Sequence, residues 1–277
     1  MEVILLGTGS PVPSPDRAGP ATLVRAGATN LLFDCGRGVV MRLAAAGMPP
    51  PALTAVLLTH MHSDHVTDLN DVITTRWVMA PQPLPLKVFG PVGAKALVEA
   101  TLAMLAFDVK YRIDHHADLN DPPKVDVTEL EPGSAFALGD VKVTAQATDH
   151  APVAPTLGYR IEHAGLVCAI AGDTVPCPGL DALCAEADIY VQTVIRDDLV
   201  RMVPNQRFKD ILDYHSTVAQ AGQTAARNRV KTLVLTHYVP AMPKGLEAEW
   251  RGFAAAHFDG EIVLGDDLTA VSIPAKG

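Results

Sequence analysis

The segment 59–65, Thr59-His60-Met61-His62-Ser63-Asp64-His65, places three imidazoles and one carboxylate within six positions. The apolar run 55–58 directly before it predicts a buried strand, so these side chains follow a strand end. Residues two apart in extended backbone point the same way, so His60 and His62 can bind one metal ion. Asp64 and His65 come at the turn into a helix predicted over 66–78 and can bind a second ion. This density of ligands predicts a metal site.

Further His and Asp residues follow apolar runs later in the chain. Asp149 and His150 come after the run 141–148, Asp173 after 166–171, and His237 after 232–235. Between the last two, Tyr214-His215-Ser216-Thr217 begins a stretch with helical periodicity over 217–228. If these strands end at one sheet edge, the side chains can meet there.

Strands and helices of this kind predict an α/β protein with sheets covered by helices. The predicted strands are 3–6, 21–25, 30–33, 55–59, 84–88, 124–130, 141–147, 157–161, 166–171, 189–193, 232–236, 261–264 and 268–273. The predicted helices are 39–46, 66–78, 93–106, 179–186, 217–228 and 247–257. No linker-like or low-complexity stretch divides the chain.

The ordered motifs resemble the metallo-β-lactamase superfamily, and within it the branch that holds ribonuclease Z and the zinc-type arylsulfatases. The resemblance runs from Leu5-Leu6-Gly7-Thr8-Gly9-Ser10 to Leu264-Gly265-Asp266-Asp267-Leu268, which is nearly the whole chain. It implies a single hydrolase domain over 1–277. It also implies a four-layer αβ/βα sandwich with metal ions at the edge where the strands end.

The resemblance implies two zinc ions per subunit and assigns their ligands by motif position. These are His60, His62 and His150 for the first ion, Asp64, His65 and His237 for the second, and Asp173 as the bridge. Imidazole and carboxylate suit zinc, and manganese or iron is also compatible. The simpler alternatives are that Asp173 caps a turn after Gly172 and that His237 is an ordinary loop histidine.

Two metal ions a few Å apart can share a water and lower its pKa, so that a bridging hydroxide attacks phosphorus or sulfur. The resemblance implies that Asp64 orients this hydroxide or accepts its proton. It also implies that His215 supplies a proton or a positive partner to the leaving oxygen. The alternative for His215 is a helix start at which Ser216 or Thr217 is the N-cap.

Other polar residues could contact the substrate, although surface solvation accounts for them more simply. Arg17 lies in the loop 13–20, and Arg196 follows the strand 189–193. A polar cluster is expected in an insert over the site. It consists of Tyr111, Arg112, His115 and His116.

The loops leave the substrate open between two classes. Ribonuclease Z usually carries a long RNA-binding arm between the third His motif and the bridging Asp, but here only 22 residues separate His150 from Asp173. The segment Arg17-Ala18-Gly19-Pro20 looks more like the arylsulfatase-type members. The leading hypothesis is a phosphodiesterase of ribonuclease Z type that cuts precursor tRNA at its 3′ end. The alternatives are an arylsulfatase or small phosphodiester hydrolase and, further away, an iron-loaded redox protein.

Composition limits the other classes of function. The net charge of −9 and the lack of a basic run argue against a general nucleic-acid binder, although a local patch or the metal ions could still bind phosphate. No apolar run approaches the roughly 20 residues of a membrane span. There is no signal-like start, and the four cysteines are expected to be reduced thiols. The sequence therefore predicts a soluble cytoplasmic protein, and the resemblance adds a homodimer.

Overall fold

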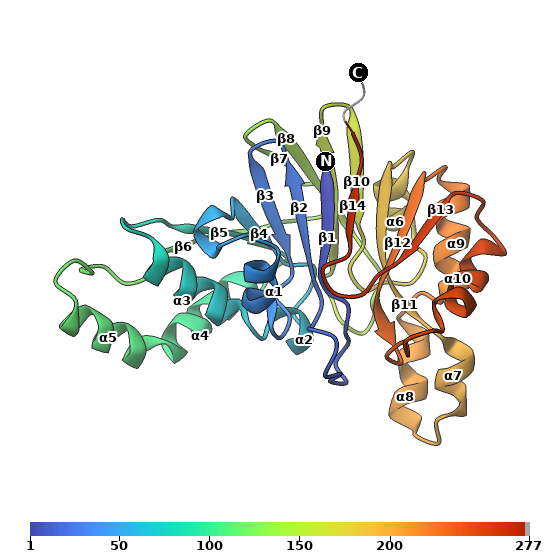
Figure 1. Ribbon diagram of the computed structural model, residues 1–277, viewed down its shortest axis with the longest axis horizontal. Helices are drawn as coiled ribbons and strands as arrows, with labels where there is room; N and C mark the ends of the chain where they lie inside the picture. The colour runs from blue at the N-terminus through green and yellow to red at the C-terminus, as the bar shows by residue number, and fades with distance from the viewer. Residues whose placement is uncertain (275–277) are drawn as a thin grey trace.

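Two seven-stranded β-sheets form the centre of the computed structural model, which describes residues 1–274 (Figure 1). The first sheet, in spatial order, is β14 (Ala270–Ser272), β1 (Glu2–Gly7), β2 (Ala21–Ala26), β3 (Thr29–Phe33), β4 (Ala55–Leu57), β5 (Leu86–Gly90) and β6 (Val125–Glu129). The second is β13 (Glu261–Leu264), β12 (Thr232–Val239), β11 (Ile189–Ile195), β10 (Leu166–Ile170), β9 (Leu157–His163), β8 (Val141–Ala147) and β7 (Ala135–Leu138).

Helices lie on the outer sides of both sheets. In the first half of the chain they are α1 (Val39–Ala45), the 3-10 helix η1 (Pro50–Ala52), α2 (Ser63–Val66), α3 (Leu69–Met79), α4 (Ala94–Met104) and α5 (Ala106–His115). In the second half they are α6 (Pro178–Cys184), α7 (Asp197–Met202), α8 (Gln206–Asp210), the 3-10 helix η2 (Ile211–Asp213), α9 (Val218–Arg227) and α10 (Glu247–Ala255).

Three apolar cores divide the molecule into four layers. Between the sheets, the rings of Phe33 on β3 and Tyr159 on β9 pack with centroids 5.6 Å apart. Outside the first sheet, buried side chains such as Val72 of α3 pack against the strands. Outside the second sheet, α6, α9 and α10 do the same, with Trp250 fully buried. The predicted four-layer αβ/βα sandwich is therefore confirmed.

Each sheet contains a group of parallel strands next to the edge where the metal ions are predicted. β3, β4, β5 and β6 run parallel in the first sheet, as do β10, β11, β12 and β13 in the second. All eight residues of β12 are buried, as expected for a parallel strand covered on both faces. Carboxyl ends of parallel strands share one edge, where polar side chains can gather.

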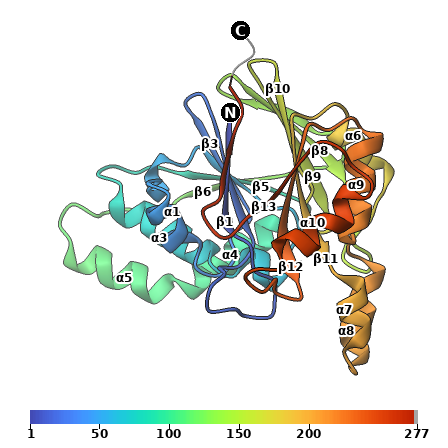
Figure 2. The ribbon, with the colours of Figure 1, turned by 45° about the vertical axis from the view of Figure 1, so that its right-hand side comes forward.

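Five elements differ from the expectations. The helix predicted over 66–78 is two helices, and Asp64 and His65 lie inside the first of them, α2. The other four have no counterpart among the predicted elements: β7, which has only four residues, and the helices α5, α7 and α8. Figures 1 and 2 show α7 and α8 projecting from one end of the molecule and α5 lying at the opposite edge.

Met1 lies beside the last described residues, because β1 pairs with β14 and the Met1 amino group donates to the Ile273 carbonyl at 3.0 Å (Figure 1). All four cysteines are free thiols: Cys35, Cys168 and Cys184 are buried and Cys177 is partly exposed. Across residues 1–274, no helix has the length and apolar character that a membrane crossing requires.

Candidate metal centre

The seven predicted metal ligands come from strand ends in both sheets. They follow β4 or lie in α2 in the first half, and in the second they follow β8 and β10 or lie within β12. Candidate ligand atoms lie within 4.8 Å of one another in two groups, His60, His62, His150 and Asp173, and Asp64, His65 and His237. We call these seven residues the donor cluster.

Acceptors behind two of the rings fix which nitrogen carries a proton. The carbonyl of Tyr214 can only accept, so it takes the Nδ1 proton of His150 at 2.8 Å. The hydroxyl of Thr59 donates to Asp34 Oδ2 at 2.8 Å, so its oxygen accepts from Nδ1 of His60 at 3.0 Å. The Nε2 atoms of His60 and His150 are therefore bare acceptors that face the cluster.

These bare nitrogens point at a third ring. Nε2 of His60 and Nε2 of His150 lie 3.0 Å and 3.2 Å from Nδ1 of His62. Burial lowers the pKa of His60 well below its usual value, lowers the pKa of His150 to about 4, and also lowers the pKa of His62. One proton on His62 could serve one neighbour but not both. A cation satisfies all three lone pairs, which is how histidines bind zinc.

The second group combines two histidines with carboxylates. Nδ1 of His65 donates to Asp34 Oδ2 at 2.8 Å, which turns Nε2 toward Asp64 and Asp173 at 3.6 Å and 3.5 Å. Nε2 of His237 lies 3.3 Å from Oδ2 of Asp64. Burial would lower the pKa of His65, but the charges of Asp173 and Asp34 hold it well above its usual value. The second group therefore pairs its imidazoles with carboxylates, where the first group sets imidazole against imidazole.

Asp173 lies at the centre of the cluster. Its Oδ2 atom is 3.2 Å from Nε2 of His215, 3.5 Å from those of His65 and His237, 3.9 Å from that of His150 and 4.0 Å from that of His60. Burial would raise the pKa of Asp173, but the charges of His237 and His65 hold it well below its usual range. Gly172 (φ 65°) makes this position possible, because a Cβ there would lie 2.8 Å from Cβ of Thr59.

Two of these atoms test whether metal ions fit. Nε2 of His65 and Oδ1 of Asp173 are buried and have no hydrogen-bond partner within residues 1–274. A buried polar atom without a partner costs about 1–3 kcal/mol, so native proteins rarely leave one unpaired. Oδ1 of Asp173 offers lone pairs at the centre of the cluster, and Nε2 of His65 offers one where a cation replaces its proton. The residues present therefore fit divalent metal ions, and imidazole with carboxylate suits zinc, manganese or iron.

His215 is held at the edge of the cluster, directly before α9. Thr217 caps α9 in a capping box, so the predicted helix start is confirmed. The ring of His215 is buried, with Nδ1 donating to the carbonyl of Ile211 at 3.0 Å and Nε2 3.2 Å from Asp173 Oδ2. Asp173, His215 and His237 also lie close enough together to hold an ion, so the geometry leaves two roles for His215.

The sequence favours a solvated surface position for Arg17, and this expectation is wrong. The Arg17 side chain is buried, and its guanidinium donates to Thr8 Oγ1 at 2.6 Å and to Asp266 Oδ1 at 2.8 Å. The guanidinium also lies over the ring of Tyr238, 4.9 Å from its centroid. Arg17 therefore holds the loop 8–20 against the strand that carries His237, and contact with substrate stays a prediction.

The expectation of a solvated surface is also wrong for Arg196. It is buried, and it donates to Asp198 Oδ1 and Oδ2 and to Glu249 Oε1 at 2.7–2.8 Å. Its guanidinium lies 4.3 Å from the ring centroid of Phe253. The side chain links α7 to α10, and its predicted substrate contact is untested.

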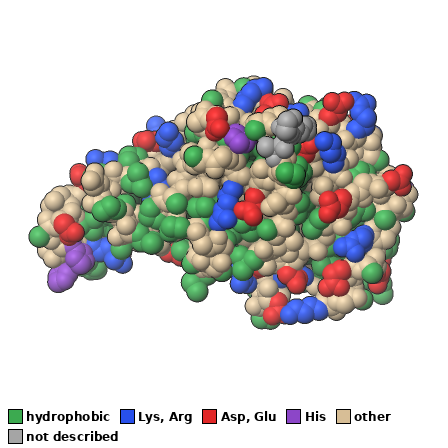
Figure 3. Space-filling view, turned by 45° about the horizontal axis from the view of Figure 1, so that its top comes forward, with side chains coloured by type: hydrophobic (Ala, Val, Ile, Leu, Met, Phe, Trp, Pro, Cys, Tyr) green, Lys and Arg blue, Asp and Glu red, His purple; other side chains and the backbone are tan. Residues whose placement is uncertain are grey.

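The polar cluster expected over the site lies elsewhere. Tyr111, Arg112 and His115 are on α5 and His116 caps it, and α5 has no buried side chain. Figures 1 and 2 both place α5 at the outer edge of the molecule, and Figure 3 shows exposed histidines gathered at that end. The expectation of a cover over the cluster is therefore wrong, because α5 continues outward from α4.

Asp34, which directly follows β3, supports two of the candidate ligands. Its Oδ1 accepts from the backbone N–H of Thr59 at 2.8 Å, and its Oδ2 accepts from the Thr59 hydroxyl and from His65. Such partners orient metal ligands. The signal was present, since Asp34 directly follows the apolar run 31–33, as the ligands follow theirs.

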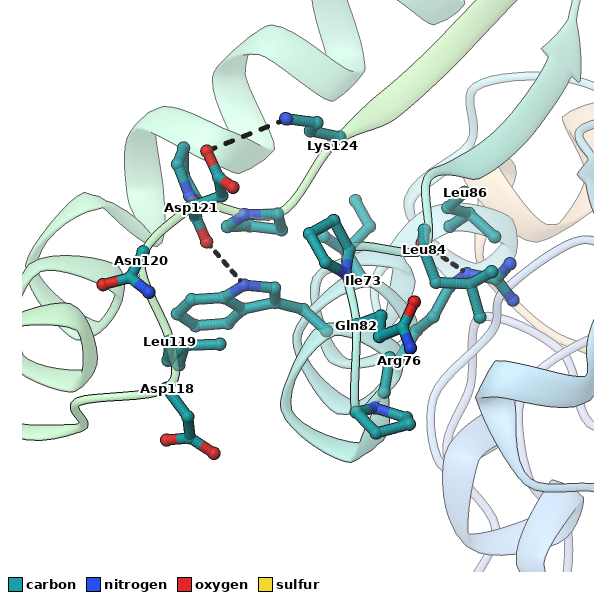
Figure 4. Close-up of a pocket in the computed structure, with 16 residues that line it drawn as sticks. Ile73, Arg76, Gln82, Leu84, Leu86, Asp118, Leu119, Asn120, Asp121 and Lys124 are labelled. Carbon is teal, nitrogen blue, oxygen red and sulfur yellow. Dashed lines mark hydrogen bonds and ion pairs between the residues drawn. The ribbon is translucent and has the colours of Figure 1, made fainter.

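A separate pocket of about 250 Å³ lies between α3 and the loop 118–124 (Figure 4). Trp77 donates its indole N–H to the carbonyl of Asp121 at 2.9 Å, which fixes one wall. The guanidinium of Arg76 is held by backbone carbonyls, including those of Pro50 and Leu53. This pocket contains no member of the donor cluster, so it is not part of the candidate metal centre.

Comparison with known proteins agrees with this architecture. A family model described as a beta-lactamase superfamily domain matches residues 29–238. Ribonuclease Z of Mycolicibacterium paratuberculosis is 55% identical over 277 residues, covering 99% of both chains. Ribonuclease Z of Mycobacterium tuberculosis strain H37Rv is 52% identical, covering 99% of this chain and 98% of the relative. The crystal structure of human tRNase Z, short form, has a TM-score of 0.73 at 25% identity, covering 99% of this chain and 100% of that one. The chain therefore belongs to the metallo-β-lactamase superfamily and, within it, to the ribonuclease Z family.

Proposed function

We propose that this protein is a metal-dependent hydrolase that cleaves a phosphodiester bond in precursor tRNA, at the 3′ end, with two zinc ions per subunit. The observation that carries the proposal is the donor cluster, in which the facing nitrogens of His60, His62 and His150 converge near the unpartnered Oδ1 atom of the ionised Asp173. The relatives named ribonuclease Z support the choice of RNA as substrate.

The chain supplies a ligand set for each ion. We assign His60, His62 and His150 to the first ion and Asp64, His65 and His237 to the second, with Asp173 between them. When bound, such ions activate water and offset the negative charge that develops on the phosphodiester. The acceptors behind the rings of His60, His65 and His150 hold their Nδ1 protons away from the cluster, so these ligands need little rearrangement to bind.

Asp64 and His215 are the residues that we propose handle protons. Burial would raise the pKa of Asp64, but its hydrogen bond with His237 and the charge of His65 keep it below the usual value, so the carboxylate can orient water or accept its proton. Nδ1 of His215 already donates to the carbonyl of Ile211, so any second proton must sit on Nε2, which faces the cluster. From there the imidazolium can donate to a leaving oxygen.

We also propose that residues 1–277 act as one hydrolase domain without a long RNA-binding arm, because 22 residues separate His150 from Asp173. The homodimer stays a prediction from the resemblance, and the cytoplasmic location stays a prediction from the sequence. The relatives reported above support ribonuclease Z rather than an arylsulfatase.

The test is a comparison of three substrates with zinc-loaded protein. They are a precursor tRNA with a 3′ trailer, bis(p-nitrophenyl) phosphate and p-nitrophenyl sulfate. We expect a single cut in the precursor after the discriminator base, together with hydrolysis of the aryl phosphodiester. Metal analysis of protein purified without added zinc gives the ion and its stoichiometry, with two zinc ions per subunit expected.

Turnover of the small esters with no defined RNA cut would reject the tRNA substrate and favour a small-ester hydrolase. Bound iron with a visible absorbance band and no hydrolysis would favour the redox alternative.

A further inference from the structure

A pocket of about 420 Å³ lies between the loop 8–20 and the start of α1. The backbone N–H of Tyr238 donates to the carbonyl of Thr8 at 3.1 Å, and that of Cys35 donates to the carbonyl of His65 at 2.6 Å. The walls of the pocket are therefore fixed to the backbone that carries two ligands. They include Ser10, Ser14, Gly19, Arg37, Met41 and Arg42.

Gly36, directly before Arg37, packs against the backbone of Asp64. A Cβ built on Gly36 would lie 2.5 Å from the backbone nitrogen of Pro20 and 2.6 Å from the carbonyl oxygen of Asp64. A residue with a side chain cannot occupy this position without moving backbone. The backbone from which Arg37 extends therefore lies directly beside α2, which carries Asp64 and His65.

Three arginines line the pocket, and two of them are already neutralised. Arg17 is paired with Asp266 at 2.8 Å, and Arg42 is paired with Asp267 at 2.9 Å. Arg37 is partly exposed and donates from Nη2 to the carbonyl of Pro11 at 2.9 Å. Within residues 1–274 it has no carboxylate within 4.0 Å, so its charge is uncompensated.

An uncompensated guanidinium at this place matters because the chain as a whole repels a polyanion. With a net charge of −9, RNA must be attracted by local groups. A guanidinium binds phosphate oxygens through several N–H donors at once. We infer that Arg37 is a substrate-positioning residue that binds a backbone phosphate of the RNA. This inference rests on the proposed function.

The experiment measures the affinity of a 3′-trailer precursor tRNA for wild-type protein and for Arg37→Ala, Arg37→Gln and Arg37→Lys, at several salt concentrations. We expect Arg37→Ala to weaken binding about tenfold and to reduce the slope of log Kd against log salt by roughly one ion. Arg37→Lys should retain most of the affinity, because it keeps the charge.

Arg37→Gln separates charge from loop anchoring. Glutamine can still donate to the carbonyl of Pro11 but has no charge, so it should bind RNA as weakly as alanine. If it binds like wild type, Arg37 only anchors the loop and the inference is overturned. The matched control is Arg251→Ala on α10, since Arg251 also donates to a backbone carbonyl, that of Ile262, and should not change the affinity.

The wild-type protein distinguishes the two proposals. If it binds and cuts the precursor but Arg37→Ala binds with unchanged affinity and salt slope, the role of Arg37 is rejected and the proposed function stands. If wild type hydrolyses bis(p-nitrophenyl) phosphate but neither binds nor cuts the precursor, both proposals are rejected. Metal content and unfolding temperature of each variant show that the fold is intact.

Discussion

The donor cluster and helix α5 both contain histidines close together, in very different surroundings. In the cluster, the rings of His60 and His62 have centroids 4.8 Å apart, and Nε2 of His60 faces Nδ1 of His62. At the end of α5, the rings of His115 and His116 have centroids 4.9 Å apart and both are exposed to solvent. Proximity of histidines therefore says little, whereas burial with converging lone pairs creates a demand for a cation.

The largest effect should come from the centre of the cluster. Asp173→Asn keeps the size of the side chain and removes the charge that faces five imidazoles. We expect loss of bound metal and a fall in turnover of at least about 10³-fold, because catalysis here depends on charge stabilisation. His62→Ala should also lose metal and activity. Metal analysis and hydrolysis of bis(p-nitrophenyl) phosphate measure both, and full activity in either variant would refute the ligand assignment.

The next effect separates the two roles that the geometry allows for His215. If it handles a proton, His215→Ala should slow turnover about 10²-fold to 10³-fold and leave the metal content at the wild-type value. If it is a ligand with Asp173 and His237, the same variant should lose metal. The ratio of metal to protein after dialysis decides, and metal loss would contradict the proton-transfer role.

A smaller effect tests the support behind the cluster. Asp34→Asn weakens the acceptor for His65 Nδ1, so metal affinity should fall about 10-fold to 100-fold. The matched control is Asp140→Asn, because Asp140 accepts from His163 at 2.9 Å in a His–Asp pair outside the cluster. Competition with a chelator measures the affinity, and an equal change in both variants would mean that the His–Asp bond at Asp34 has no special role.

The sequence could single out the residues that the structure brings together in the donor cluster because they follow short apolar runs, as His60 follows 55–58 and Asp173 follows 166–171. The alternation of strands and helices alone indicated only an α/β protein, and the family resemblance supplied the four layers. Contacts between distant positions could not be predicted. The burial of Arg17 depends on Asp266, 249 positions away, and the tautomer of His150 on the carbonyl of Tyr214, 64 positions away.

Short elements without a clear period were also beyond prediction. The strand β7 has four residues, too few to show an alternating pattern. Helix α5 carries no buried side chain, so its sequence has no buried apolar stripe from which a helix could be predicted. Without such a stripe, its polar residues suggest a substrate-binding insert.

The smallest effect should come from α5 itself. Tyr111 is 66% exposed, and Arg112 pairs with Asp108 one helical turn away, an arrangement worth about 0.3–0.5 kcal/mol. The triple variant Tyr111→Ala, Arg112→Ala, His116→Ala should therefore keep wild-type metal content and hydrolyse bis(p-nitrophenyl) phosphate within about twofold of wild type.

Precursor tRNA is the substrate with which α5 could prove to have a function as well as the cluster. An RNA is large enough to touch a helix that lies away from the reacting phosphate, and Tyr111 and Arg112 offer stacking and charge. If α5 is only a solvated surface, the triple variant should bind precursor tRNA within about twofold of wild type. A tenfold loss of affinity with unchanged hydrolysis of the small ester would instead make α5 a binding element for the distal part of the RNA. The sequence would then have identified the right residues for substrate contact while placing them wrongly over the metal centre.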